Sequence, residues 1–271
     1  MTSIRGKFGI NTYSYTQSMR AADCLRRLAG EGVTTFELMF YPGHLWITDD
    51  AAAFREVRQI IDDGGLQLVS MNGPNVDLNI AAATQEMRAL SIELNTAYIR
   101  MAGELGARGL ILGPGKPNPL FPLPADILEG HFFAALDKLC PVAATCGIEL
   151  WVENMPFAFM PEATRLMASL DRYGSDALKI CYDVANAHFI GEDPVAGLST
   201  VAPRLAVVHV SDTTRGTYRH DPVGDGDIDF ARLPRAIADV GYDRSVVLEV
   251  ISRNADADNF RSMDALAEAG F

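Results

Sequence analysis

Short apolar runs alternate with longer segments of helical periodicity along this chain, and this alternation constrains the fold more than any other feature. Eight runs can be read, at residues 8–14, 34–41, 66–74, 109–115, 148–156, 178–188, 205–212 and 245–250. Most are nearly continuous in Val, Ile and Leu, which is typical of parallel strands covered on both faces. Eight strand–helix pairs in succession, with no block of hairpins, predict a closed barrel or a large doubly wound sheet.

Glycines mark the predicted junctions between helices and strands. Gly32, Gly65, Gly106, Gly147 and Gly241 each follow a helical segment, where glycine can adopt the left-handed conformation that ends a helix. No GxGxxG follows the first strand and no Walker loop is present, which argues against a nucleotide-binding doubly wound sheet. No linker or low-complexity tract divides the chain. We therefore predict an α/β fold, a single (β/α)8 TIM barrel domain over residues 1–271.

The composition of the chain limits the kinds of partner that we expect it to bind. The formal net charge is −12, and an acidic surface repels phosphate backbones, so we expect no nucleic acid partner. The start of the chain, MTSIRGKFGI, lacks the apolar run of a signal peptide, and no segment reaches the ~18 apolar residues of a membrane span. The four cysteines form no CxxC pair, as is usual in a reducing compartment. These features predict a cytoplasmic protein without a membrane partner.

Polar residues collect where four consecutive strands are predicted to end. Glu153, Asp183, His209 and Glu249 each follow an apolar run, in WVE, ICYD, VVH and VLE. Active sites of such barrels lie at these strand ends, and buried carboxylates must be paired, neutralised or bound to a cation. Each residue alone is compatible with a strand-end cap or a salt bridge, but together they predict a site for one divalent metal ion. Three oxygens and one nitrogen favour Mn²⁺ or Mg²⁺, with Co²⁺ or Zn²⁺ as alternatives.

The segments around these residues resemble the xylose-isomerase-like TIM-barrel superfamily, the sugar phosphate isomerases and epimerases. The resemblance covers nearly the whole chain and is carried by WVENMP, CYDVANAHFIGEDP, VVHVSDT, HDPVGDGDIDF and VLEV. It implies that Glu153, Asp183, His209 and Glu249 are the metal ligands. It also implies that the two glutamates carry protons to and from a substrate carbon, as in the ketose epimerases of the group.

One position departs from the pattern of that superfamily. Many members have a histidine three residues after the aspartate of the sixth strand, whereas this chain has Asn186 there and His188 two residues later. This difference argues against a second metal ion. Both residues are candidates for binding substrate oxygens.

The resemblance implies a divalent-metal-dependent isomerase or epimerase of a small sugar, sugar phosphate or related polyol-ketone. The reaction would proceed by proton abstraction to a metal-stabilised enediolate, with Glu153 and Glu249 on either side of the substrate. A dehydratase of the inosose or 3-dehydroshikimate kind needs the same first step, followed by loss of a β-hydroxyl. The sequence leaves these activities open, as it does the phosphorylation of the substrate.

A DNA-repair activity is a remote alternative, because endonuclease IV shares this barrel. Enzymes of that type need a three-zinc cluster with further histidines after the third and fourth strands. The corresponding segments here, SMNGPN and LGPGKP, contain none.

Further candidates for contact with a carbohydrate-like substrate lie in other predicted loops and strands. His220 and Arg219 precede VGDGDIDF, and Trp46 lies in the loop after the second strand, where an aromatic ring can pack on a sugar face. Asn11 and Glu37, on the first two strands, can either line the pocket or form buried hydrogen bonds. Relatives are often dimers or tetramers, so a homo-oligomer is a further expectation.

Overall fold

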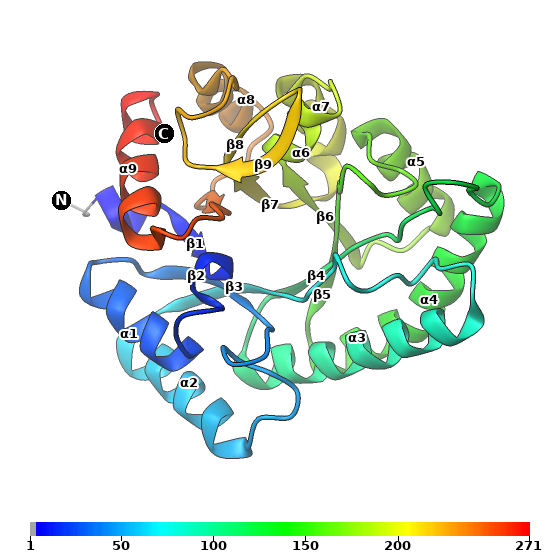
Figure 1. Cartoon of the computed structure of the whole chain (residues 1–271), viewed down its shortest axis with the longest axis horizontal. Helices are drawn as coiled ribbons and strands as arrows, with labels where there is room; N and C mark the ends of the chain where they lie inside the picture. The colour runs from blue at the N-terminus through cyan, green and yellow to red at the C-terminus, as the bar shows by residue number, and fades with distance from the viewer. Residues whose placement is uncertain (1–3) are drawn as a thin grey trace.

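The structure, a computed structural model, describes residues 4–271 and contains a closed barrel of parallel strands (Figure 1). In sheet order the strands are β1 (Gly9–Asn11), β10 (Val247–Leu248), β7 (Leu205–Val210), β6 (Leu178–Asp183), β5 (Glu149–Glu153), β4 (Gly109–Leu112), β3 (Gln67–Asn72) and β2 (Thr35–Met39). The first and last barrel strands, β1 and β10, pair with each other and close the sheet. The predicted (β/α)8 barrel is confirmed. That residues 1–271 form a single domain remains a prediction.

Helices surround the barrel on the outside (Figure 1). They are α1 (Ala21–Gly30), α2 (Ala51–Gly64), α3 (Gln85–Leu105), α4 (Ala125–Cys146), α5 (Ala163–Tyr173), α6 (Val184–Phe189), α7 (Pro194–Val201), α8 (Leu233–Asp239) and α9 (Ala255–Glu268). Residues 4–271 also contain the short 3₁₀ helices η1 (Ile4–Lys7), η2 (Tyr13–Tyr15), η3 (Ala202–Arg204) and η4 (Phe230–Arg232). None of the helices in the described part of the chain is long and apolar enough to cross a membrane.

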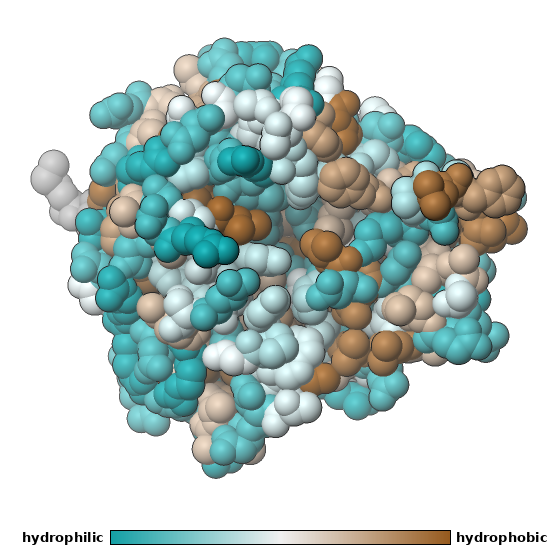
Figure 2. Space-filling view, in the orientation of Figure 1, coloured by the Kyte–Doolittle hydropathy of each residue, from teal (hydrophilic) through white to brown (hydrophobic). Residues whose placement is uncertain are grey.

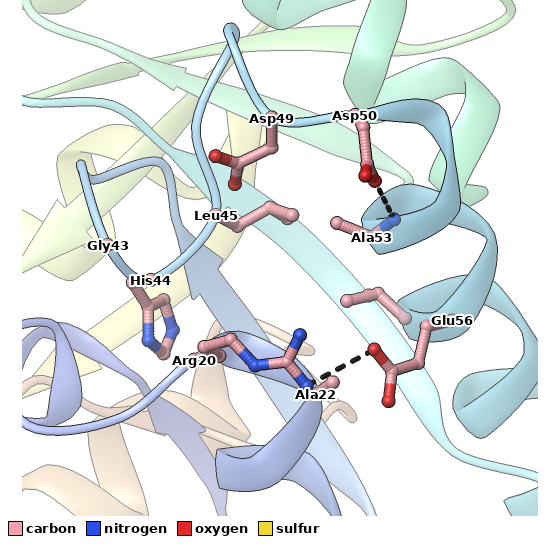
Figure 3. A pocket seen from close by; sticks show the side chains of 10 residues that line it. Arg20, Ala22, Gly43, His44, Leu45, Asp49, Asp50, Ala53 and Glu56 are labelled. Atoms are coloured by element: carbon pink, nitrogen blue, oxygen red, sulfur yellow. Dashed lines mark hydrogen bonds and ion pairs between the residues drawn. The ribbon is translucent and has the colours of Figure 1, made fainter.

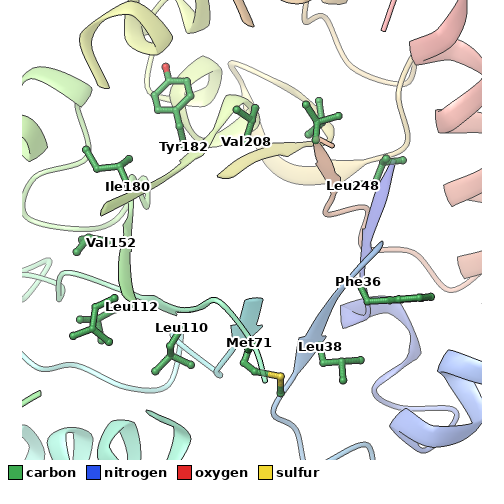
Figure 4. Close-up of a cluster of buried hydrophobic side chains, with 14 of the residues drawn as sticks. Phe36, Leu38, Met71, Leu110, Leu112, Val152, Ile180, Tyr182, Val208 and Leu248 are labelled. Atoms are coloured by element: carbon green, nitrogen blue, oxygen red, sulfur yellow. The ribbon is translucent and has the colours of Figure 1, made fainter. Parts of the chain in front are cut away.

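The core has two parts because strand side chains alternate between the inside and the outside of the barrel. Figure 4 shows Phe36, Val152 and Leu248 among side chains that point away from the barrel axis toward the helices. A smaller cluster contains Trp151 and Val207 with other residues of the strands. A Cβ atom on Gly109 would lie only 2.3 Å from the Trp151 ring, so the glycine on β4 makes room for the large indole on β5.

The predicted helix ends are confirmed where glycine was expected to terminate a helix. Gly65, Gly106 and Gly147 follow α2, α3 and α4 in the left-handed conformation, with φ angles of 58°, 78° and 71°. In each case the amide of the glycine donates to a carbonyl of the last helical turn. These glycines therefore fix where the chain turns back toward the barrel.

An antiparallel hairpin that the sequence did not suggest follows β7. Its strands are β8 (Asp212–Thr214) and β9 (Thr217–Asp221), and both are too short and polar to give a strand signal. The carboxylate of Asp212 accepts hydrogen bonds from the backbone amides of Thr213, Gly224 and Ile228. Asp212 thus ties the hairpin to the following turn and fixes the position of β9 above the barrel.

Candidate metal and substrate site

Four side chains from neighbouring strands meet at the carboxyl end of the barrel. Glu153 ends β5, Asp183 ends β6, His209 lies near the end of β7 and Glu249 directly follows β10. One potential ligand atom from each lies within 4.8 Å of the others, and all four residues are buried. The parallel register explains this convergence, because Asp183 pairs with His209 and His209 with Val247 in adjacent strands.

This cluster contains three carboxylates and one imidazole, which makes it suitable for a metal ion. The Oδ2 atom of Asp183 is buried and has no hydrogen-bond partner. Burial and the charge of Glu249 raise the pKa of Glu153 well above its ordinary value, and burial raises the pKa of Asp183 to about 6. An unsatisfied buried carboxylate oxygen costs free energy, and a divalent cation would remove that cost. Three carboxylates and one imidazole fit a single such ion.

A second layer of hydrogen bonds holds the imidazole of His209. Its Nε2 atom lies 3.1 Å from Oε2 of Glu37, and its Nδ1 atom lies 3.1 Å from Oε2 of Glu249. Glu37 is fully buried on β2 and also accepts hydrogen bonds from Asn11, Ser70 and Asn72. An Nε2–H that donates to Glu37 leaves Nδ1 free to bind a cation, so Glu37 fixes the orientation and tautomer of the ring.

Asn11 and Glu37 therefore lie beneath the cluster as parts of this buried network. The Nδ2 atom of Asn11 donates to Oε1 of Glu37 over 2.5 Å and lies 3.4 Å from Oε1 of Glu249. Of the two interpretations that the sequence allowed for these residues, the geometry corresponds to buried hydrogen bonds. A direct contact of Asn11 with substrate remains a prediction.

A hydrogen-bonded chain of side chains covers the other side of the cluster. Asn186 donates from Nδ2 to Oε1 of Glu153 over 2.9 Å and accepts at Oδ1 from the hydroxyl of Tyr218, also over 2.9 Å. The same Tyr218 hydroxyl lies 2.8 Å from Nε2 of His220, whose Nδ1 atom lies 2.9 Å from the Ser211 hydroxyl. This chain connects Glu153 to the β8–β9 hairpin.

Tyr218 is a site residue that the sequence reasoning missed. It lies on β9 two residues before His220, so the two side chains share a face of that strand and Arg219 occupies the other. Arg219 is exposed, with an Nη1 atom 3.9 Å from Asp221. In a strand, alternate side chains lie on the same face, so Tyr218 could have been predicted from His220. That prediction requires knowing that this segment is a strand, which its sequence does not indicate.

A cavity of about 240 Å³ opens above the cluster. It is lined by Tyr13, Met39, Tyr41, Asn72, Gly73, Pro74, Asn75, Val76, Asp77, Glu153, Met155, Tyr218, His220, Glu249 and Ile251. The molecular face drawn in Figure 2 is hollowed near its centre, with hydrophobic residues beside the hollow. Val76 and Ile251 are 68% and 41% exposed, so apolar side chains form part of the cavity rim.

Three residues proposed from sequence for substrate binding do not line this cavity. Trp46 packs against Tyr98, with the ring centroids 5.8 Å apart. The Nε2 atom of His188 pairs with Oδ1 of Asp227, and Arg219 extends into solvent. Their roles in substrate binding remain predictions. Of the proposed substrate-binding residues, His220 lines the cavity and Asn186 contacts Glu153.

The closed barrel and the cluster at its strand ends define an α/β barrel protein with a candidate functional site at the carboxyl face of the sheet. A family model described as xylose isomerase-like TIM barrel matches residues 25–269. The chain belongs to this family, as its motifs predicted.

Similar proteins include sugar epimerases. The chain is 23% identical over 265 residues to L-ribulose 3-epimerase of Mesorhizobium japonicum, covering 96% of this chain and 86% of that protein. A solved D-tagatose 3-epimerase-like protein has a TM-score of 0.85 at 20% identity, with 97% and 96% of the two chains covered. A solved IolI protein with a bound zinc atom has a TM-score of 0.78 at 14% identity, with 97% and 96% covered. The structural likeness shows the shared fold, and the names of the relatives support the expectation of an enzyme.

Proposed function

We propose that the protein is a divalent-metal-dependent isomerase or epimerase of a small sugar-like ketose, acting by proton removal next to a carbonyl group. The observation that carries the proposal is the position of Glu153 and Glu249. These carboxylates come from different strands, belong to the four-residue cluster and line the same cavity. The similarity to L-ribulose 3-epimerase supports the same reaction class.

Glu153, Asp183, His209 and Glu249 would hold the cation, with Mn²⁺ or Mg²⁺ as the expected ion. When bound, the ion would supply an electrophile that makes the C–H bond beside a carbonyl more acidic. Location in the cytoplasm and assembly into an oligomer remain predictions from the sequence.

The chain's own residues would position and move the proton. One carboxylate removes the proton from the substrate carbon, and the other can return a proton from the far side of that carbon. Asn186 holds Oε1 of Glu153 in place, and His209 and His220 lie 3.1 and 3.6 Å from Oε2 of Glu249. Tyr218, which is bonded to both Asn186 and His220, keeps these two sides of the cavity at a fixed spacing.

The test combines metal analysis with isotope exchange. The wild type and Glu153→Gln would be incubated with a panel of ketoses in D₂O, with Mn²⁺ or Mg²⁺ added, and elemental analysis would give the bound metal. We expect about one ion per wild-type chain and deuterium in a sugar product of otherwise unchanged composition. Loss of a general acid or base costs about 10²–10⁴-fold in rate, so exchange should fall at least that far in the variant.

Glu149→Gln is the matched control, since Glu149 begins the same strand and its carboxylate accepts from the Trp151 indole away from the cavity. It should keep both the metal and the exchange. Release of water instead of exchange at constant mass would identify the dehydratase. A wild-type protein that folds but binds no divalent metal would refute the proposal.

A further inference from the structure

A second cavity adjoins the catalytic cavity. It has a volume of about 430 Å³ and is lined by Tyr13, Ser14, Thr16, Gln17, Ser18, Ile251, Ser252 and Arg253, from the segments that follow β1 and β10. Tyr13 and Ile251 line both cavities, so the two spaces meet at these side chains. A substrate that fills the smaller catalytic cavity can therefore extend into the larger one.

Four hydroxyl groups of the second cavity, those of its serines and its threonine, have already donated their protons within the protein. Those of Ser14, Thr16 and Ser18 bond to the backbone carbonyls of residues 250, 13 and 15 over 2.6, 2.8 and 3.3 Å. Ser252 bonds to the carboxylate of Asp258. Carbonyl and carboxylate oxygens have no proton to give, so each hydroxyl must be the donor. The oxygens can offer only lone pairs to a ligand.

Donors and apolar surface complete the lining. Gln17 and Arg253 are exposed, and no hydrogen bond or ion pair within residues 4–271 occupies the Gln17 amide or the Arg253 guanidinium. The Tyr13 ring and Ile251 give apolar contact surface at the junction. A sugar ring presents hydroxyl donors, oxygen acceptors and apolar C–H groups together, which matches this lining.

A phosphate group fits the two cavities less well. It presents acceptor oxygens and negative charge, so it would face the lone pairs of the hydroxyls and leave them without a donor. Asp77, Glu153 and Glu249 line the catalytic cavity, and none of its described lining residues is Lys or Arg. Asp77 is not one of the proposed metal ligands, so its carboxylate would still repel a dianion when the ion is bound.

We infer that the second cavity is a subsite for a second sugar ring, so that the substrate is a neutral ketose in glycosidic linkage rather than a sugar phosphate. The inference rests on the proposed function, because it takes the ketose unit to lie in the catalytic cavity. Gln17 and Arg253 would donate to the oxygens of the second ring, whose hydroxyls would donate to the serine and threonine oxygens.

Fructose, fructose 6-phosphate and glucosyl-fructoses provide a matched set of probes. Isomaltulose carries glucose on the oxygen that bears the phosphate in fructose 6-phosphate, and leucrose and maltulose carry it on neighbouring oxygens. Binding to the Mn²⁺-loaded full chain would be measured by calorimetry, and deuterium exchange separately. We expect at least one disaccharide to bind about tenfold more tightly than fructose, the effect of one or two hydrogen bonds, and fructose 6-phosphate to bind no more tightly than fructose.

Variants of two lining residues test whether the second cavity is the source of the gain in affinity. Gln17→Ala and Arg253→Ala should each lower the affinity for that disaccharide several-fold and leave fructose binding within twofold of wild type. Arg235→Ala, which removes an arginine that is 85% exposed on α8, should change neither. Both target side chains are exposed and unbonded, so the variants should fold.

The outcomes separate this inference from the proposed function. Tightest binding of fructose 6-phosphate, lost in Arg253→Ala, would overturn the inference in favour of an anion site. Exchange on fructose without tighter binding of any disaccharide would also overturn it while leaving the proposed function intact. Tighter disaccharide binding that depends on Gln17 and Arg253, without exchange, would support the subsite and contradict the proposed reaction.

Discussion

The cavity at the strand ends and a hollow beside α1 and α2 (the α1–α2 hollow) are both lined by carboxylates and a histidine. The charges of the two places are arranged differently. The α1–α2 hollow has a volume of about 290 Å³, and its lining includes Arg20, His44, Asp49, Asp50 and Glu56 (Figure 3). Figure 3 shows Arg20 joined to Glu56 and Asp50 joined to the backbone amide of residue 53. Asp49 accepts from the backbone amide of residue 46. The charges of this hollow are thus satisfied by their own surroundings.

His44 of the α1–α2 hollow and His209 of the four-residue cluster at the strand ends show the same contrast. Nδ1 of His44 lies 2.7 Å from the Met19 carbonyl, and its Nε2 lies 3.0 Å from the Thr12 hydroxyl, so a neutral ring satisfies both contacts. His209 instead lies between the carboxylates of Glu37 and Glu249, beside Oδ2 of Asp183, which accepts no hydrogen bond. Similar residue types therefore form a self-contained structural pocket in one place and a buried group of acids suited to a cation in the other.

The largest expected difference between the hollows is their response to a divalent ion. At a free Mn²⁺ concentration 100 times the dissociation constant, ligand binding should raise the free energy of unfolding of the wild type by about 2.7 kcal/mol. Asp183→Asn should lose this gain, while its metal-free form should unfold at no lower denaturant concentration, since a buried carboxylate oxygen without a hydrogen bond has been removed. Chemical denaturation with and without Mn²⁺ would measure both quantities. An equal gain in the variant would contradict the assignment of the site.

The hydrogen bond from His209 to Glu37 gives the next largest effect. Glu37→Gln keeps the shape of the side chain but removes the negative charge that orients the imidazole. Loss of such an outer partner typically lowers metal affinity 10–100-fold, and we expect this range from titration calorimetry with Mn²⁺. Unchanged affinity would mean that the strand register alone positions His209.

A smaller effect is expected in the pH dependence of stability, through His44 of the α1–α2 hollow. Burial lowers the pKa of His44 in the folded protein below its ordinary value near 6.5. At a pH between these two pKa values, the unfolded chain binds more protons than the folded chain. The free energy of unfolding should therefore fall as the pH drops below about 6.5. His44→Asn retains a donor for the Met19 carbonyl but cannot titrate, and it should show a shallower fall. Denaturation curves between pH 7 and pH 5 would compare the two, and equal slopes would contradict this account.

The smallest effect is expected from the ion pair of the α1–α2 hollow. Glu56 bonds to Arg20 and Arg26 at the surface, where exposed pairs contribute little to stability. Glu56→Gln should leave both the Mn²⁺ affinity and the deuterium exchange at wild-type values. A change in either would show that the two hollows are coupled, which would break the contrast drawn between them.

The sequence alone determined the barrel and the four residues that meet at its strand ends. Apolar runs and glycine helix ends are local signals: Gly147 predicted the end of a helix, and α4 ends at Cys146 directly before it. Parallel strands of one barrel end at one face, so residues such as Glu153 and His209 could be expected to meet there before any contact was known.

Tertiary structure decided what supports and extends that cluster. The contact between His209 and Glu37 joins residues 172 positions apart, and no local periodicity reports such a pairing. Tyr218 could be recognised as a site residue only once β9 was known to be a strand. Asp212 and the turn that follows hold this polar strand in place, whereas most strands are held by burial of an apolar face. The adjoining cavity likewise exists because the segments after β1 and β10, at opposite ends of the chain, become neighbours when the barrel closes.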